Sequence, residues 1–557
     1  MEKIWLKHYP PGVPETIDAS NLGTLVDVLL ASCREHADLI AFKSEFGNLT
    51  YAELDAKSLA FASFLQQEWG LKKGMRFGLM LPNVLAYPIA MLGALRAGLI
   101  VVNINPLYTQ RELTHQLVDA GCHHVLVLDM FAHTLADSWD EAHMVKAMVA
   151  HLGDFYAPWK GGLLQIILKY VARKIPTWHL PDYISLQDAL AYGKDKTLDK
   201  VNIDKYDVAF LQYTGGTTGV SKGAELTHFN LLSNLLQANA WVQPALALHD
   251  FKTQLIIVTA IPLYHIFSLT ANGLLFMYLG GKNLLILNPR DFEGFVKRLQ
   301  KEEFHAITGV NSLFNSLLNT PGFDKINFSS LLFCLGGGTA IQEEVAKHWI
   351  AKTGMPLLAA YGLTETSPAA VITPLAAKAY NSSVGLPISS TEISIRNDKG
   401  EELALGDAGE LCIRGPQVMR GYWHNEAETR LVFWPQGWLR TGDIAKIDEQ
   451  GQVYILDRSK DMILVSGFNV YPNEVEAVLA MHPGILESGV IGIPSDSSGE
   501  QVKAFIVKKD PNLTVDSVLE HCRKNLTGYK VPHVIEFCDE LPKTAVGKIL
   551  RKELRNR

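Results

Sequence analysis

The sequence predicts an α/β protein with a large N-terminal domain of α/β layers plus a β-rich subdomain, and a small, mobile α+β C-terminal domain. Three observations support this prediction. Through about residue 455, short apolar or β-branched runs alternate with helical patterns, as they do in βαβ units with parallel sheet. After residue 380, short strand patterns are separated by turn signals. The C-terminal part again alternates helix-like and strand-like runs.

The N-terminal domain is expected to span residues 1–456. Its most apolar long stretch, 87–104, is interrupted by Arg96 and by two glycines, so it fits a buried helix leading into a strand better than a membrane span. We therefore expect no transmembrane helix. The clearest strand patterns are the apolar runs 99–102, 124–128, 255–258 and 284–287.

The C-terminal domain is expected to span residues 462–557, joined through a polar hinge at 457–461. Turn signals at 397–400 and 448–451 mark the β-rich subdomain that precedes the hinge. The expected C-terminal elements are a helix near 473–481, strands at 490–493 and 503–507, and a helix near 514–525.

Composition and charge exclude several classes of protein. Of the 557 residues, 48% are hydrophobic and 20% charged, which is far from the composition of disordered chains. A net charge of −7 provides no positive field for a nucleic-acid backbone, so no nucleic acid is expected as a partner. The six cysteines form no CxxC pair, and the N-terminus lacks the apolar run of a signal peptide. These features predict a reduced, cytoplasmic protein.

The strongest local signal is the loop 213–223, which follows the apolar run 208–211. Its glycines let the backbone approach an oxyanion, its threonines add hydroxyl donors, and Lys222 supplies positive charge. A merely flexible turn would not require adjacent threonines and a lysine. The loop is not a Walker A motif, because Ser221 rather than glycine precedes Lys222. We expect it to cradle a triphosphate.

This loop resembles the phosphate-binding motif of the adenylate-forming superfamily, which includes acyl-CoA synthetases, aryl-CoA ligases, firefly luciferase and the adenylation domains of peptide synthetases. Further motifs of the family recur in the same order from about residue 25 to the C-terminus. The resemblance implies ATP, Mg²⁺ and coenzyme A as cofactors or cosubstrates. It implies that the phosphates would be held by Tyr213, Thr214, Gly215, Gly216, Thr217, Thr218, Gly219 and Lys222, with Thr217 also catalytic.

The run 361–366 is similar to the family's adenine and magnesium motif. Tyr361 would stack on adenine, and Thr364 would meet the α-phosphate. Glu365 would coordinate Mg²⁺, which proteins usually hold with few carboxylates plus substrate phosphates, although alone it would pass for an acid at a helix start. The resemblance adds Gly338, Thr339, Ala340 and Gly362 to the nucleotide contacts.

The run 438–443 resembles the motif whose aspartate accepts both ribose hydroxyls. The two acceptor oxygens of Asp443 match a vicinal diol, whereas the alternative is an ordinary aspartate in a turn. Arg458 corresponds to the arginine that contacts ribose and phosphate.

Two segments of the C-terminal domain resemble parts that serve different half-reactions. Lys548 would bridge the attacking carboxylate and the α-phosphate, whereas Gly467 would leave room for the pantetheine of coenzyme A. Both cannot occupy one active site together. We therefore expect the domain to rotate about Lys460 between two poses.

The acyl pocket is expected near His265, for which positioning is favoured over general-base catalysis. Apolar walls from Phe267, Val310 and Phe314 suit an alkyl chain, which gains about 0.8 kcal/mol per buried CH₂. Over its full length the chain looks closest to bacterial long-chain-fatty-acid–CoA ligases, chiefly on the run 460–472.

The expected reaction is ATP-dependent ligation of a long-chain fatty acid to coenzyme A through an acyl-adenylate, with release of AMP and pyrophosphate. A medium-chain or aryl-acid CoA ligase would share every phosphate motif. A peptide-synthetase module would need a carrier domain after the catalytic loop. A non-catalytic lipid-binding protein would keep an apolar pocket but would need none of Lys222, Glu365, Asp443 and Lys548.

One basic, amphipathic stretch, residues 159–178, allows two interpretations. It is a surface helix packed on the large domain, or it contacts the inner face of the membrane peripherally. A homodimer is likewise left open.

Overall fold

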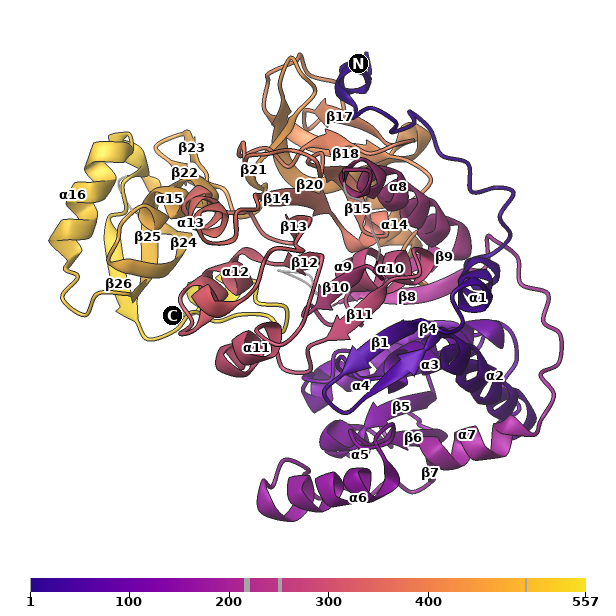
Figure 1. Ribbon diagram of the computed structural model, residues 1–557. Coiled ribbons are helices and arrows are strands. Elements are labelled where there is room, and N and C mark those ends of the chain that lie inside the picture. Colours follow the sequence, from indigo (N-terminus) through magenta and orange to yellow (C-terminus); the bar gives the residue numbers. More distant parts are fainter. Residues whose placement is uncertain (1, 215–220, 249–252, 496–497) are drawn as a thin grey trace.

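A computed structural model describes residues 2–214, 221–248, 253–495 and 498–557. The described part contains four β-sheets within a large N-terminal domain and a smaller C-terminal domain (Figure 1). The predicted fold class is confirmed. None of the described helices combines the length and the apolar character that a bilayer span requires.

The first sheet is parallel except for the antiparallel pair β8–β9. The loop between these two strands is the predicted phosphate cradle, of which residues 215–220 lie outside the described residues. The spatial order is β7 (Tyr183–Ser185), β6 (Lys146–Ala150), β5 (His124–Leu128), β3 (Arg76–Met80), β4 (Ile100–Asn103), β8 (Val208–Thr214) and β9 (Lys222–Thr227).

The second sheet is parallel through its centre and antiparallel at both edges. Its strand β11 begins two residues before the predicted run 284–287, because the backbone N–H of Lys282 already bonds Leu255 O at 2.7 Å. The order is β16 (Leu386–Pro387), β15 (Ala369–Ile372), β14 (Leu357–Gly362), β13 (Phe333–Gly336), β12 (Ala306–Gly309), β10 (Ile256–Thr259), β11 (Lys282–Leu285), β1 (Ile40–Ser44) and β2 (Gly47–Thr50).

Helix α8 (His228–Leu246) leaves β9 directly, and its start is fixed by a capping box. The Oγ1 of Thr227 accepts from the backbone N–H of Asn230 at 3.1 Å, while Asn230 Oδ1 accepts from the N–H of Thr227 at 3.0 Å. The other N-terminal helices are α1 (Leu25–Glu35), α2 (Tyr51–Gln67), α3 (Ala86–Arg96), α4 (Gln110–Ala120), α5 (Ala132–Asp137), α6 (Pro158–Ile166), α7 (Leu186–Lys194), α9 (Ile266–Ser268), α10 (Leu275–Tyr278), α11 (Phe292–Leu299), α12 (Asn311–Leu318) and α13 (Glu343–Thr353).

The predicted β-rich subdomain is an antiparallel sheet, and the turn 448–451 joins its strands β20 and β21 as expected. Helix α14 (Glu426–Leu431) lies between β18 and β19 in the chain. The strands are β17 (Glu392–Arg396), β18 (Gly409–Arg414), β19 (Phe433–Trp434), β20 (Trp438–Ile447) and β21 (Val453–Arg458).

The C-terminal domain has a mixed sheet with its own apolar core. The predicted strands 490–493 and 503–507 are the central parts of one long hairpin, β24–β25. The domain limits at 456 and 462 stay predictions. The elements are β22 (Ile463–Val465), β23 (Phe468–Val470), α15 (Pro472–Ala480), β24 (Ile485–Ser495), β25 (Gly499–Lys508), α16 (Val515–Asn525), β26 (Val534–Cys538) and α17 (Arg551–Arg555).

Candidate active site

A cavity of about 2240 Å³ lies where the N-terminal domain meets the C-terminal loop 542–551. The sequence-predicted residues that line it are Tyr213, Thr214, Lys222, His265, Gly338, Thr339, Ala340, Tyr361, Gly362, Thr364, Glu365, Asp443, Arg458 and Lys548. Gly215, Gly216, Thr217, Thr218 and Gly219 lie outside the described residues.

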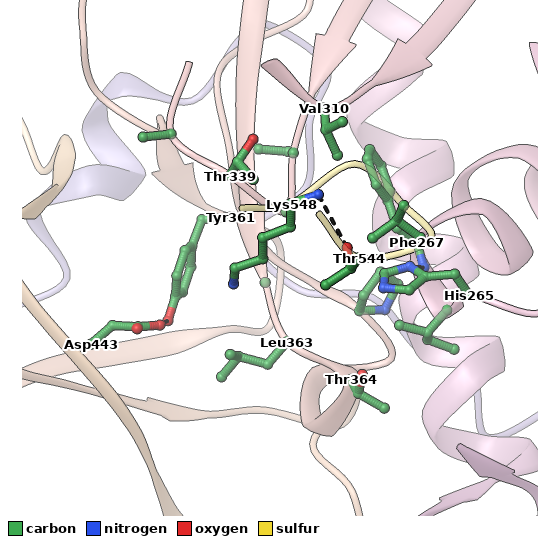
Figure 2. Close-up of a pocket in the computed structure, with 18 of the residues that line it drawn as sticks. His265, Phe267, Val310, Thr339, Tyr361, Leu363, Thr364, Asp443, Thr544 and Lys548 are labelled. Atoms are coloured by element: carbon green, nitrogen blue, oxygen red, sulfur yellow. Dashed lines mark hydrogen bonds between the residues drawn. The ribbon is translucent and has the colours of Figure 1, made fainter. Parts of the chain in front are cut away.

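The predicted ribose site is already engaged in hydrogen bonds. The hydroxyl of Tyr361 donates to Asp443 Oδ2 at 2.6 Å (Figure 2). Arg458 Nε lies 3.1 Å from Asp443 Oδ1. Because β20 pairs with β21, Asp443 and Arg458 face each other across the two strands. Burial and the neighbouring Asp443 carboxylate raise the pKa of Tyr361, so its hydroxyl stays a donor. A bound ribose diol would replace Tyr361 and Arg458 as the partners of the two Asp443 carboxylate oxygens.

The magnesium candidate, Glu365, contacts a residue that the sequence did not single out. The hydroxyl of Tyr422 donates to Glu365 Oε1 at 2.7 Å. Lys222 forms an ion pair with Glu428 of α14, and its ammonium lies 5.2 Å from the centre of the Tyr422 ring. Tyr422 therefore lines the cavity beside Glu365, while Glu428, outside the described lining, pairs with Lys222 at the predicted phosphate end. Their only sequence signal is the run 422–429, whose spacing suggests just a capped helix.

Lys548 reaches the cavity from a docked loop. Ser312 Oγ donates to Gly547 O at 2.8 Å, and Arg290 Nη2 donates to Thr544 O at 3.2 Å. The Lys548 amino group points toward Tyr361 and Asp443 (Figure 2). Burial, and then the positive charge of Arg458, lower the pKa of Lys548 to about 8.

The surroundings of His265 favour the neutral form of its imidazole ring. Its Nδ1 accepts the backbone N–H of Phe267 at 3.3 Å, which leaves the ring proton on Nε2. Burial, and then the Lys548 charge, lower the pKa of His265 to about 4. This geometry supports the positioning role over general-base catalysis.

The described residues that line the cavity do not include Gly467. It lies at the turn between β22 and β23 with φ +85°, and a Cβ built there would meet no atom within 4 Å. The structure thus brings Lys548 to the cavity and leaves Gly467 away from it.

Two arginines tie the predicted hinge to the C-terminal domain. Arg551 contacts Asp457 at 3.3 Å, Asp461 at 3.5 Å and Glu476 at 2.9 Å, and all three carboxylates are largely buried. Arg555 adds a contact of 2.7 Å to Asp461. These ion pairs hold the residues next to Lys460 in the observed pose.

Two of the three predicted acyl-pocket residues line the cavity. Phe267 and Val310 do so, and Phe267 packs so closely on Gly337 that a Cβ there would lie 3.1 Å from the ring. Phe314 is not among the described lining residues and instead packs on Trp349, with ring centroids 4.8 Å apart.

Residues 29–423 match the profile of the AMP-binding enzyme family, and residues 474–548 match the AMP-binding enzyme C-terminal domain. A long-chain-fatty-acid–CoA ligase of Escherichia coli O157:H7 is 51% identical, covering 100% of this chain and 98% of that relative. One from Haemophilus influenzae is 47% identical with the same coverage. The crystal structure of the anthranilate CoA ligase AuaEII with anthranoyl-AMP has a TM-score of 0.84 at 24% identity, covering 97% of this chain and 98% of that one. This last likeness concerns the fold.

Proposed function

The chain belongs to the AMP-binding enzyme family, and on this premise we propose that it joins a long-chain fatty acid to coenzyme A through an acyl-adenylate, consuming ATP. One observation carries the proposal. Lys222, Glu365, Asp443 and Lys548, which lie far apart in sequence, line the same cavity as an apolar wall. A lipid carrier would not need these four charges.

In the first half-reaction, a carboxylate oxygen of the fatty acid attacks the α-phosphorus of ATP, and the bond to pyrophosphate breaks. The Lys548 ammonium would stabilise the charge that develops on the attacking and phosphoryl oxygens, and Thr364 would donate to the α-phosphate. Lys222 would exchange Glu428 for the leaving phosphates. Asp443 would fix the ribose, so that the α-phosphorus faces Lys548.

In the second half-reaction, the sulfur of coenzyme A attacks the acyl carbonyl carbon, and AMP leaves. We propose that the C-terminal domain rotates about Lys460, which withdraws Lys548 and brings Gly467 to the cavity. A glycine suits that position, because its φ of +85° and its missing side chain leave a passage for pantetheine.

The donor set fits Mg²⁺ as the ion that accompanies ATP. Glu365 is a carboxylate on the cavity wall, and Mg²⁺ is usually held by one or two carboxylates together with substrate phosphates. Bound there, the ion would neutralise phosphate charge. Tyr422 would hold the Glu365 carboxylate in place.

The test is release of AMP and pyrophosphate with oleate, octanoate and coumarate as competing acids. The highest kcat/KM is expected for oleate. A highest value for octanoate or coumarate would favour a medium-chain or aryl-acid ligase. If no acid causes pyrophosphate release, the alternative of a non-catalytic lipid-binding protein would be favoured.

We also propose that the segment formed by α6, the helical turn Ile167–Val171 and residues 172–174 contacts an anionic membrane surface. Leu164 and Leu168 pack on the domain core, whereas six large apolar side chains of the segment are exposed. Its basic residues can face lipid phosphates. The exposed apolar residues are Trp159, Leu163, Ile166, Ile167, Tyr170 and Val171.

Flotation with liposomes containing anionic lipid tests this contact. Replacing Lys160, Lys169, Arg173 and Lys174 by glutamate should abolish co-flotation while CoA ligase activity on soluble octanoate persists. Unchanged flotation would reject the membrane contact. The homodimer stays a prediction, and analytical ultracentrifugation would test it by measuring the mass of the protein in solution.

A further inference from the structure

The apolar end of the cavity runs along helix α8. Its lining positions there are Asn234, Ala238, Trp241 and Val242, which recur at the helical spacing and so share one face. Asn234 marks the end near the nucleotide, because its side chain exchanges hydrogen bonds with both backbone groups of Ala369, at 2.8 and 3.1 Å. From Asn234 to Trp241 the helix rises about 10 Å.

Residues of β13 and of the helical segment 269–278 form two other walls of the cavity. On β13, Leu335 and Phe333 line the cavity at successive inward positions before Gly337, which packs on Phe267. On the facing helical segment, Thr270 donates to Ser367 O at 2.8 Å near the nucleotide end, and Leu275 lines the cavity one turn further along. Beyond Asn234 and Thr270, the lining named here is apolar.

Trp241 and Val242 are the last residues of α8 among the described cavity lining. The Trp241 side chain is 1% exposed, and its Nε1 has no hydrogen-bond partner among the described residues. The indole is therefore held by packing. Tyr9 meets it edge-on, with ring centroids 5.0 Å apart and an interplanar angle of 90°.

The N-terminal segment that carries Tyr9 is fastened to the domain. The Tyr9 hydroxyl donates to Pro387 O at 2.6 Å, and Ser389 Oγ donates to Pro14 O at 2.6 Å. The backbone N–H of Ser390 bonds Glu15 O at 2.8 Å. Tyr9, which is not among the described lining residues, therefore backs Trp241 from outside the channel.

We propose that Trp241, braced by Tyr9, is the floor of the acyl channel and sets the longest chain that the enzyme accepts. The inference rests on the proposed function and adds a specificity-determining pair to it. A smaller residue at position 241 would lengthen the channel, whereas a bulky residue at position 238 would block it about five-sixths of a turn earlier.

The test compares kcat/KM for laurate, palmitate and arachidate. Trp241→Leu should raise the arachidate-to-palmitate ratio about tenfold or more, the scale on which a hydrophobic pocket discriminates. Ala238→Trp should retain laurate and lose palmitate. Tyr9→Ala, which removes the brace, should shift the ratio in the same direction as Trp241→Leu, by a smaller factor.

Two controls separate channel length from general damage. Trp349→Leu removes another fully buried tryptophan, which lies outside the described cavity lining. Gln243→Trp adds the same bulk as Ala238→Trp on the exposed side of α8. Both should keep the wild-type order of substrates.

The outcomes are distinguishable. If the Trp241→Leu and Ala238→Trp variants are active and keep the wild-type order of substrates, Trp241 is not the floor of the channel. The ligase assignment would be unaffected by that result. If Trp241→Leu fails to fold, Ala238→Trp and Tyr9→Ala decide by the same ratio. A wild-type enzyme that activates no fatty acid would overturn both.

Discussion

Lys548 lines the central cavity, whereas Gly467 of the same domain lies away from it at an exposed turn. This is the arrangement that the proposed first half-reaction requires. Since the C-terminal domain carries both residues, the proposed second half-reaction needs another pose.

Lys548→Ala should separate the two half-reactions. Loss of its ammonium should lower acyl-adenylate formation by at least about a hundredfold, as for removal of one preorganised transition-state donor. Thioester formation from supplied acyl-adenylate should stay near wild type. Single-turnover assays of each half-reaction measure this, with the exposed Lys524→Ala on α16 as control. Equal loss of both steps would contradict domain alternation.

The pKa of Lys548 predicts a pH limit. Because burial lowers this pKa to about 8, the ammonium form is present below that pH and is lost as pH rises through it. The value of kcat/KM for ATP in adenylation, which reports the free enzyme, should fall over this range. Lys548→Arg keeps its charge and should show weaker activity without the decline. A rate that still rises beyond the pKa would count against a protonated Lys548.

Glu428→Gln should tighten ATP binding. Glu428 pairs with Lys222, so the phosphates of ATP must compete with a carboxylate for the same ammonium. Removal of that charge should lower the Kd for ATP several-fold, since the pair is partly exposed and screened. Isothermal titration calorimetry measures the change, and Glu426→Gln on the same helix is the control. Weaker binding would instead identify Glu428 as a residue that positions Lys222.

Arg551→Met should destabilise the C-terminal domain. It leaves the Asp457, Asp461 and Glu476 carboxylates without their shared cation, and breaking a buried ion pair from one side costs about 3–5 kcal/mol. Hydrogen exchange in α15 and β24 should accelerate relative to wild type. The matched control, Lys524→Met, removes an exposed pair and should leave exchange unchanged. Unaltered protection in Arg551→Met would show that the network does not hold the domain.

The resemblance of local runs to the motifs of one family was enough to predict which distant segments meet at the nucleotide end. Tyr361, Asp443 and Lys548 were assigned from that resemblance, and all three line one cavity. Glu428 could not be found that way, because its contact with Lys222 spans 206 residues and depends on how α14 packs beside β9. The prediction of the acyl-pocket wall was partly wrong for a similar reason. Phe314 is apolar and near the right motif, but α12 turns it toward Trp349.

The most direct test of the central claim is transfer of oxygen from the fatty acid to the nucleotide. Palmitate with both carboxylate oxygens labelled with the heavy isotope of oxygen is turned over with ATP and coenzyme A, and the products are analysed by mass spectrometry. Attack on the α-phosphorus predicts one labelled oxygen in AMP and one in the thioester carbonyl. Unlabelled AMP formed together with acyl-CoA would contradict the account.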